Sequence, residues 1–142
     1  MDSLRLSRIL GLDYGERRIG LALSDPLGII AKPLTVIDIK KTKDYFSEIL
    51  KIINNNDVSS VVVGLPLTLK GKNSKQTEIV ISFIDQLKNK IHLPIITIDE
   101  RLSSLAAEKS LIDQGIKTGH NKALIDQTAA AIFLQEHLDS SI

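Results

Sequence analysis

The pattern of apolar and polar positions divides the chain into short strands and amphipathic helices. Aliphatic and β-branched runs bounded by turn residues predict strands over 5–12, 18–24 and 29–37. A turn at 14–17 joins the first two strands as a hairpin. Pro33 places the third strand towards an edge of the sheet, because proline cannot donate a hydrogen bond to a neighbouring strand.

Two later runs, "SSVVVGLP" and "LPIITIDER", are continuously aliphatic, as parallel strands are when helices cover both faces. Apolar residues at helical spacing predict four helices, over 42–54, 74–88, 103–114 and 122–138. Gly115 is well placed to end the third helix. This order of elements predicts an α/β domain with helices on both faces of the sheet and ligand sites beyond the carboxyl ends of its parallel strands.

Length and composition narrow the class of protein. The 142 residues are enough for one domain, spanning 1–142, and too few for two. The chain has no cysteine, which excludes disulfides, thiolate metal sites and a cysteine nucleophile. It has no long apolar run, so we expect no signal peptide, no membrane span and a cytoplasmic location. The net charge of +1 is small, so any phosphate must be bound by local cations.

Acidic residues end two strands of the predicted sheet. Asp13 ends the first strand, and Asp99 and Glu100 end the last one. A charged residue can simply mark where a strand emerges into solvent, so this position alone does not establish a site. Adjacent residues of a strand point to opposite faces, and the sequence does not decide which of Asp99 and Glu100 points inwards.

A third acid lies on a helix face that should pack on the sheet. The positions three, four and seven residues after Asp126 are Ala129, Ala130 and Phe133. The run "TAAA" would let this helix approach the strands closely and bring Asp126 within reach of Asp13. Two alternatives stay open: an acid that faces solvent near the positive end of the helix dipole, and a salt bridge to a nearby lysine.

These acids together indicate a site for a divalent cation. An ionised acid that is buried without a partner must take up a proton or find a cation. All the candidate ligands are carboxylate oxygens, so Mg²⁺ or Mn²⁺ fits best. Two such ions, about 4 Å apart, could activate a water and stabilise the leaving oxygen of a displacement at phosphorus.

Four sequence blocks resemble the signature blocks of one protein family in their order along the chain. "GLDYGERRIGLALSD", "VVVGLPLTLKG", "IDERLSS" and "IDQTAAAIFLQEHL" are similar to those of the YqgF (RuvX-type) family and span about residues 8–138. The resemblance implies an RNase H-like three-layer α/β/α fold, with a five-stranded mixed sheet of order 3-2-1-4-5 whose second strand is antiparallel. It implies a metal-dependent nuclease that processes the 5′ end of the precursor of 16S ribosomal RNA, related to Holliday junction resolvases.

The resemblance also implies roles for individual residues. Asp13, Glu100 and Asp126 match the catalytic, metal-binding acids of the family, and Asp99 could share or replace the role of Glu100. The implied metal is Mg²⁺ or Mn²⁺. The implied partner is nucleic acid, as structured RNA or branched DNA, and the protein would act as a monomer or a homodimer.

Basic residues cluster in the loops predicted at the same edge of the sheet. We expect them to position a phosphate backbone around the acidic centre, although each could also be an ordinary solvated loop residue. Arg18 has two interpretations, a phosphate clamp or a structural partner of an acid such as Asp25. The expected contacts are Arg17, Arg18, Lys70, Lys72, Lys75, Arg101 and Lys122, with Lys117 and His120 nearby.

Two other functions compete with a nuclease. "LDYGERRIG" also resembles the first phosphate loop of the sugar-kinase and actin superfamily, but those proteins need two such domains to enclose a nucleotide. A non-catalytic RNA-binding factor in ribosome assembly is the stronger alternative. Mutation of Asp13 distinguishes it from a nuclease, because only a nuclease would lose cleavage and keep binding.

Overall fold

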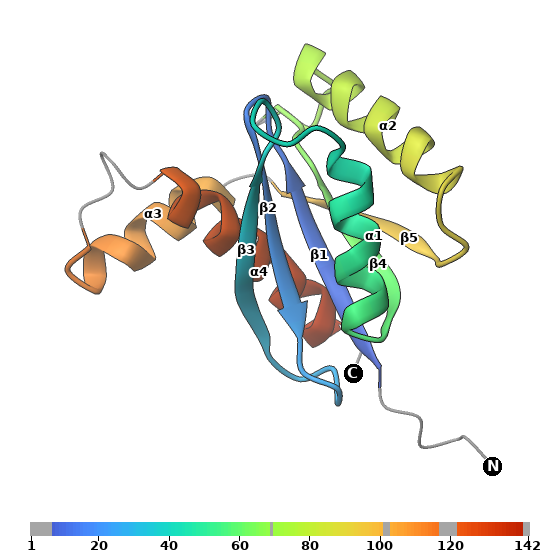
Figure 1. The fold of residues 1–142 in the computed structure, drawn as a ribbon. Helices are drawn as coiled ribbons and strands as arrows, with labels where there is room; N and C mark the ends of the chain where they lie inside the picture. Colours follow the sequence, from blue (N-terminus) through green and yellow to red (C-terminus); the bar gives the residue numbers. More distant parts are fainter. Residues whose placement is uncertain (1–6, 69, 101–102, 117–121, 141–142) are drawn as a thin grey trace.

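The computed structural model describes residues 7–68, 70–100, 103–116 and 122–140, and this part of the chain forms a five-stranded sheet and four helices (Figure 1). The strands are β1 (Arg8–Tyr14), β2 (Arg18–Ser24), β3 (Ala31–Asp38), β4 (Val58–Leu65) and β5 (Ile95–Asp99). The helices are α1 (Tyr45–Asn55), α2 (Lys75–Lys88), α3 (Ser103–Asp113) and α4 (Lys122–Ser140).

The sheet has the strand order β3-β2-β1-β4-β5. β2 runs antiparallel to both β1 and β3, whereas β4 runs parallel to β1 and β5. The predicted strand order and the antiparallel second strand are therefore confirmed. The ends of β1, β3, β4 and β5 meet the start of β2 at one edge of the sheet, which we call the carboxyl edge.

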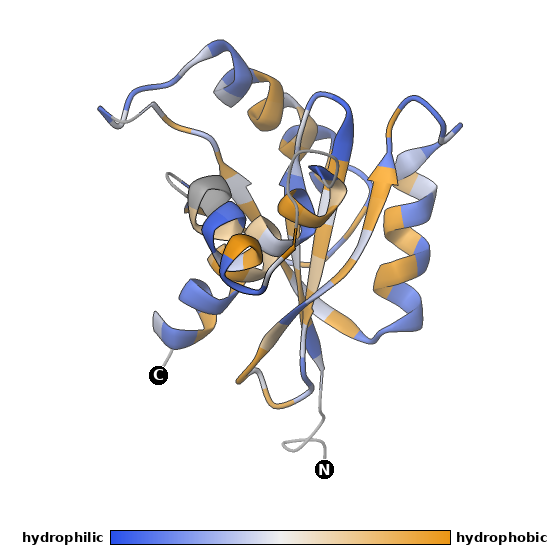
Figure 2. Cartoon of the chain, turned by 90° about the vertical axis from the view of Figure 1, so that its left-hand side faces the viewer, coloured by the Kyte–Doolittle hydropathy of each residue, from blue (hydrophilic) through white to orange (hydrophobic). Residues whose placement is uncertain are grey.

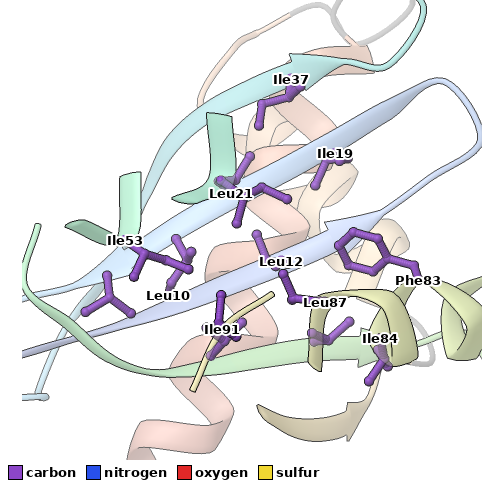
Figure 3. Packing of buried hydrophobic residues seen from close by; sticks show 14 of the residues in the cluster. Leu10, Leu12, Ile19, Leu21, Ile37, Ile53, Phe83, Ile84, Leu87 and Ile91 are labelled. Carbon is purple, nitrogen blue, oxygen red and sulfur yellow. The ribbon is translucent and has the colours of Figure 1, made fainter. Parts of the chain in front are cut away.

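Helices cover both faces of the sheet, as predicted. The larger core lies between one face and the pair α1 and α2, and Figure 3 shows its side chains, including Leu12, Ile53 and Phe83. On the other face α4 packs through its alanines and Phe133. α3 packs mainly against α4 (Figure 1). Figure 2 shows the hydrophobic strands with helices on both sides.

Small residues let α4 lie very close to the sheet. Gly11 on β1 faces Leu134, and a Cβ atom at Gly11 would lie only 3.1 Å from Cβ of that leucine. Ala129 and Ala130 of α4 are fully buried. The sequence "TAAA" therefore has the predicted effect of bringing this helix against the strands.

The strand boundaries differ from the predicted ones for local reasons. β1 continues to Tyr14, so Asp13 lies inside the strand, one residue before its end. The predicted beginning of β1, at residues 5 and 6, lies outside the described residues. β3 begins at Ala31 because the carboxylate of Asp25 accepts hydrogen bonds from the backbone N–H groups of the two preceding residues, Ile29 and Ile30.

The helix boundaries follow capping residues. α1 begins three residues after the predicted Thr42, because Asp44 caps it with its side chain. Ser74 caps α2 and forms a reciprocal capping box with Thr77. Gly115 has a φ of 79° and ends α3, as predicted. Among the described residues, no helix combines the length and apolarity that a membrane crossing requires.

Candidate active site

Asp13 lies in a row of residues that crosses the sheet just inside the carboxyl edge. Its partner on β2 is Gly20. Its neighbour on β4 is Gly64, one step beyond the pair Leu12 and Val63. Side chains alternate along a strand, so Asp13 points to the face that α4 covers. A carboxylate thus sits between two glycines, at the place where the sheet meets a helix.

The two glycines give the space that the other acids occupy. A Cβ atom at Gly64 would lie 2.5 Å from Oε2 of Glu100 and 2.7 Å from Cε2 of Phe133. A Cβ atom at Gly20 would lie 2.5 Å from the carbonyl carbon of Asp126. Because no larger residue fits at either position without a shift, both glycines are part of the construction of the site.

The structure places Glu100, and not Asp99, against Asp13. Asp99 is the last residue of β5 and pairs with Leu65, and the N–H of Glu100 donates to the carbonyl of Leu65 at 3.3 Å. Ile98, two residues before Glu100, packs against the core beneath α4. Glu100 follows the same alternation and turns its carboxyl group to the α4 face.

The carboxyl groups of Asp13 and Glu100 share a hydrogen bond. The pKa of Asp13 is raised to about 6 and that of Glu100 to about 9, mainly by burial, and the negative charge of Asp126 contributes to both increases. The hydrogen bond lowers the pKa of Asp13 and raises that of Glu100, so Glu100 carries the shared proton and donates it. At neutral pH the metal-free pair therefore holds one proton and about one negative charge.

Asp126 is paired with a cation of the chain itself. Nε of Arg18 donates to Oδ2 of Asp126 at 2.8 Å, and both side chains are 28% exposed. The alternative of a salt bridge to a lysine is thus wrong in its partner, since the cation is an arginine on β2. Asp126 still lies near enough to the other acids for its charge to raise their pKa values.

The acids fit a divalent cation by their chemistry, although they are not yet assembled around one. Within the described part of the chain, no three Asp, Glu or His side chains are gathered as a metal site. Asp13 and Glu100 touch, while Asp126 is held by Arg18. All the donors are carboxylate oxygens, which Mg²⁺ and Mn²⁺ prefer, and the touching pair needs a proton or a cation to offset its repulsion.

Two of the three predicted arginine contacts are engaged with acids. Arg17 donates through Nε to both oxygens of Asp38, at 3.2 and 3.3 Å. Arg18 is a structural partner of an acid, as one of its two interpretations had it, but the acid is Asp126 and not Asp25. Asp25 instead accepts backbone N–H groups of its own turn, which lower the pKa of its carboxyl group.

The predicted lysine contacts are exposed at the expected edge. Lys70 and Lys72 lie in the loop after β4, Lys75 begins α2 and Lys122 begins α4, and all four side chains are exposed. None of them forms a salt bridge with a described carboxylate. Arg101, Lys117 and His120 lie outside the described residues.

The "GLP" that ends the run "SSVVVGLP" predicts only that Gly64 shapes the exit of a strand, and the sequence pattern drew no attention to Gly20. The structure gives both a place in the site, next to Glu100 and Asp126 respectively. The signal was present in the sequence, because an isolated glycine inside a strand pattern indicates close approach of another group. The partner of each glycine became visible only with the sheet register.

The fold is that of the Holliday junction resolvases. RuvC from T. thermophilus, in a structure titled as a complex with Holliday junction substrate, superposes with a TM-score of 0.59 at 15% identity, over 95% of each chain. The fowlpox virus resolvase, also in a complex with junction DNA, gives a TM-score of 0.60 at 12% identity, over 95% of this chain and 99% of that one. These similarities establish an RNase H-like resolvase fold.

Sequence similarity identifies the family. Residues 7–140 match the family model RuvX, described as Holliday junction resolvase. A relative from Roseiflexus sp. (strain RS-1), named "Putative pre-16S rRNA nuclease", is 46% identical over 133 residues, 94% of each chain. A relative of the same name from Clostridium novyi (strain NT) is 38% identical over 94% of this chain and 98% of its own length. The chain belongs to the RuvX family.

Proposed function

We propose that the chain is a metal-dependent nuclease that hydrolyses phosphodiester bonds in structured RNA and processes the 5′ end of the 16S rRNA precursor. The observation that carries the proposal is the contact of Asp13 with Glu100 at the carboxyl edge, in a member of the RuvX family. The names of the relatives support the RNA substrate, and the family description supports action on branched nucleic acid. The protein would act in the cytoplasm, as a monomer or a homodimer.

Asp13 and Glu100 would hold Mg²⁺ or Mn²⁺, and Asp126 would complete the site. When bound, the metal supplies a polarised water and charge stabilisation for the leaving oxygen. Glu100 must first release its proton to solvent, because a protonated carboxyl group is a poor ligand. Gly64 leaves the space in which the carboxyl group of Glu100 turns towards Asp13.

Arg18 binds Asp126 in the structure and would also bind the substrate. Nε is the only atom of the Arg18 side chain that donates to a described residue, which leaves its two terminal NH₂ groups for a second anion. A non-bridging oxygen of the scissile phosphate is such an anion, and guanidinium groups bind phosphate strongly. The side chain would then place the phosphate beside the carboxylates of Asp13 and Glu100.

One observation favours a non-catalytic RNA-binding factor as the second candidate. The repulsion among the acids is already reduced to about one negative charge, by the proton between Asp13 and Glu100 and by the Arg18–Asp126 ion pair. A protein that only binds RNA needs no more than this. The two functions differ in what happens when Asp13 is replaced.

The test is a panel of labelled substrates incubated with Mg²⁺ or Mn²⁺: a 16S precursor fragment, a single-stranded RNA and a four-way DNA junction. We expect metal-dependent cleavage of the precursor, lost in Asp13→Asn while binding of the RNA persists. If the purified protein binds the precursor but cuts none of these substrates with either metal, the binding factor is the correct description.

A further inference from the structure

The loop between β3 and α1 carries three lysines at the carboxyl edge. Lys40, Lys41 and Lys43 are all exposed. Asp38 at the end of β3 pairs with Arg18 at the start of β2, so the loop leaves the sheet beside the ion pair that holds Asp126. We name residues 39–43 the lysine loop.

Both ends of the lysine loop are fixed to the site. At its start, the N–H of Ile39 donates to the carbonyl of Arg17 at 2.9 Å. At its end, the hydroxyl of Tyr45 lies 3.3 Å from that of Tyr14, the residue next to Asp13. The loop therefore keeps a defined position relative to the catalytic acids.

Asp38 also fixes the backbone inside the loop. Its Oδ1 accepts hydrogen bonds from the N–H groups of Lys40 and Lys41, at 3.0 and 3.3 Å. Arg17 binds the same carboxylate and balances its charge. The Arg17–Asp38 pair thus orders the loop, which gives Arg17 a positioning role.

The positive charge of the lysine loop is not neutralised by nearby acids. None of its lysines forms a salt bridge with a described carboxylate. Asp38 binds Arg17 and Glu48 lies 3.6 Å from Lys51, so both are paired with other cations, whereas Asp44 keeps its charge and accepts a hydrogen bond from Ser47. Three lysines against one unpaired acid leave this segment with a net positive charge, which attracts a polyanion.

We propose that the lysine loop binds the phosphate backbone of the substrate nucleic acid on the β3 side of the scissile bond. Strands are about 4.8 Å apart, so this loop and the lysines after β4 stand about 14 Å from each other across the edge. Asp13 lies between them, on β1. A nucleic-acid strand spanning both groups would therefore cross the carboxyl edge at β1, the strand that carries Asp13. The inference rests on the proposed function for its substrate, but binding tests it without any cleavage.

A groove beside the loop would seat the backbone. It has a volume of about 470 Å³, lies along the free edge of β3, and is lined by Thr35, Asp38, Lys41 and Lys43 together with Glu48 at the start of α1. The two lysines line the groove itself, and Lys40 lies directly beside them. Phosphate contacts of this kind position a substrate without reading its sequence.

The experiment compares two triple variants of equal charge in the Asp13→Asn background, which prevents cleavage. One carries Lys40→Ala, Lys41→Ala and Lys43→Ala. The control carries Arg8→Ala, Lys32→Ala and Lys88→Ala, at the starts of β1 and β3 and at the end of α2, at the opposite end of the sheet. Fluorescence anisotropy measures the affinity for a labelled RNA hairpin with a single-stranded 5′ extension, and for a four-way DNA junction, from 50 to 300 mM salt.

We expect the loop variant to bind at least tenfold more weakly at about 0.1 M salt, with the control unchanged. The slope of log affinity against log salt should fall by about 2 for single-stranded contacts and nearly 3 for duplex contacts. Equal loss in both variants, or no loss in the loop variant, would overturn the proposal. The single variant Lys41→Ala, with circular dichroism on each protein, ensures that the result does not depend on a misfolded triple variant.

The outcome is separable from that of the proposed function. If binding depends on the lysine loop but the unmodified protein cuts no substrate, the lysine loop is a nucleic-acid contact and the nuclease proposal is refuted. If the unmodified protein cleaves with metal but the loop variant binds as well as the control, the nuclease proposal is supported and the role of the lysine loop is refuted.

Discussion

Gly64→Ala should separate activity from stability more sharply than any other small change in the site. The added Cβ would lie 2.5 Å from Oε2 of Glu100 and 2.7 Å from the ring of Phe133. Phe133 is fully buried, so it has little freedom to move. The carboxyl group of Glu100 is the end of a flexible side chain and will yield first.

The size of the effect follows from these two contacts. Relieving the clash requires a shift of Glu100 by about 1 Å, and a misplacement of that size in a catalytic group costs about a hundredfold in rate. Overpacking of this kind lowers the free energy of unfolding by about 1–3 kcal/mol. We therefore expect about hundredfold slower cleavage and weaker Mn²⁺ binding in a protein that still folds.

The assays are precursor cleavage, Mn²⁺ titration and urea unfolding, each with Gly28→Ala as the matched control. Gly28 has a φ of 70° with nothing within 4 Å of an added Cβ, so alanine there strains the backbone by about 1 kcal/mol and leaves the site untouched. If Gly64→Ala cleaves and binds Mn²⁺ like the unmodified protein, Glu100 does not need the position that the structure gives it.

Three further predictions concern the surroundings of the acids. Gly20→Ala should lower the free energy of unfolding by at least about 3 kcal/mol in urea titration, because its Cβ meets the backbone of α4 at Asp126, which cannot rotate away; a loss below about 1 kcal/mol would contradict the close packing. Arg18→Met should bind Mn²⁺ about fivefold more tightly by calorimetry, because it removes a cation that competes with the metal for Asp126; at this exposure the ion pair is worth up to about 1 kcal/mol. The control Arg18→Lys keeps the positive charge and should change the Mn²⁺ affinity little. Weaker Mn²⁺ binding by the Met variant would show instead that Arg18 orients Asp126 for the metal. The metal-free protein should lose stability as the pH rises from 5 to 9. The pKa values of Asp13, raised to about 6, and of Glu100, raised to about 9, make the folded state hold protons that the unfolded state has already released. Urea titrations at several pH values should show a smaller loss of stability in Asp13→Asn, and a loss equal to that of the unmodified protein would place the cause in other groups.

The sequence was sufficient for the features that depend on pattern and order. The alternation of elements predicted helices on both faces of the sheet, the family resemblance implied the strand order, and the small residues after Asp126 predicted the close approach of α4. Asp13 could be placed because it follows a buried run. These features are local, so they can be recognised before any register is known.

The remaining features depend on which residues face each other across strands. Glu100 could be preferred over Asp99 only by family resemblance, because the face each occupies depends on where β5 pairs with β4. Several acids along the chain could pair with Arg18, and only the packing of α4 on β2 shows that its partner is Asp126 and not Asp25. The lysine loop was not predicted as a contact, because it is far from Asp13 along the chain and only the strand order shows that both lie at the carboxyl edge.

Calorimetric titration of Mn²⁺ into the purified protein tests most directly whether Asp13 and Glu100 form a site for a divalent cation. We predict saturable binding, tightening as the pH rises towards 9 because Glu100 must release its proton, and abolished in both Asp13→Asn and Glu100→Gln. Binding of the same affinity in those two variants, or no binding at millimolar Mn²⁺, would contradict the account.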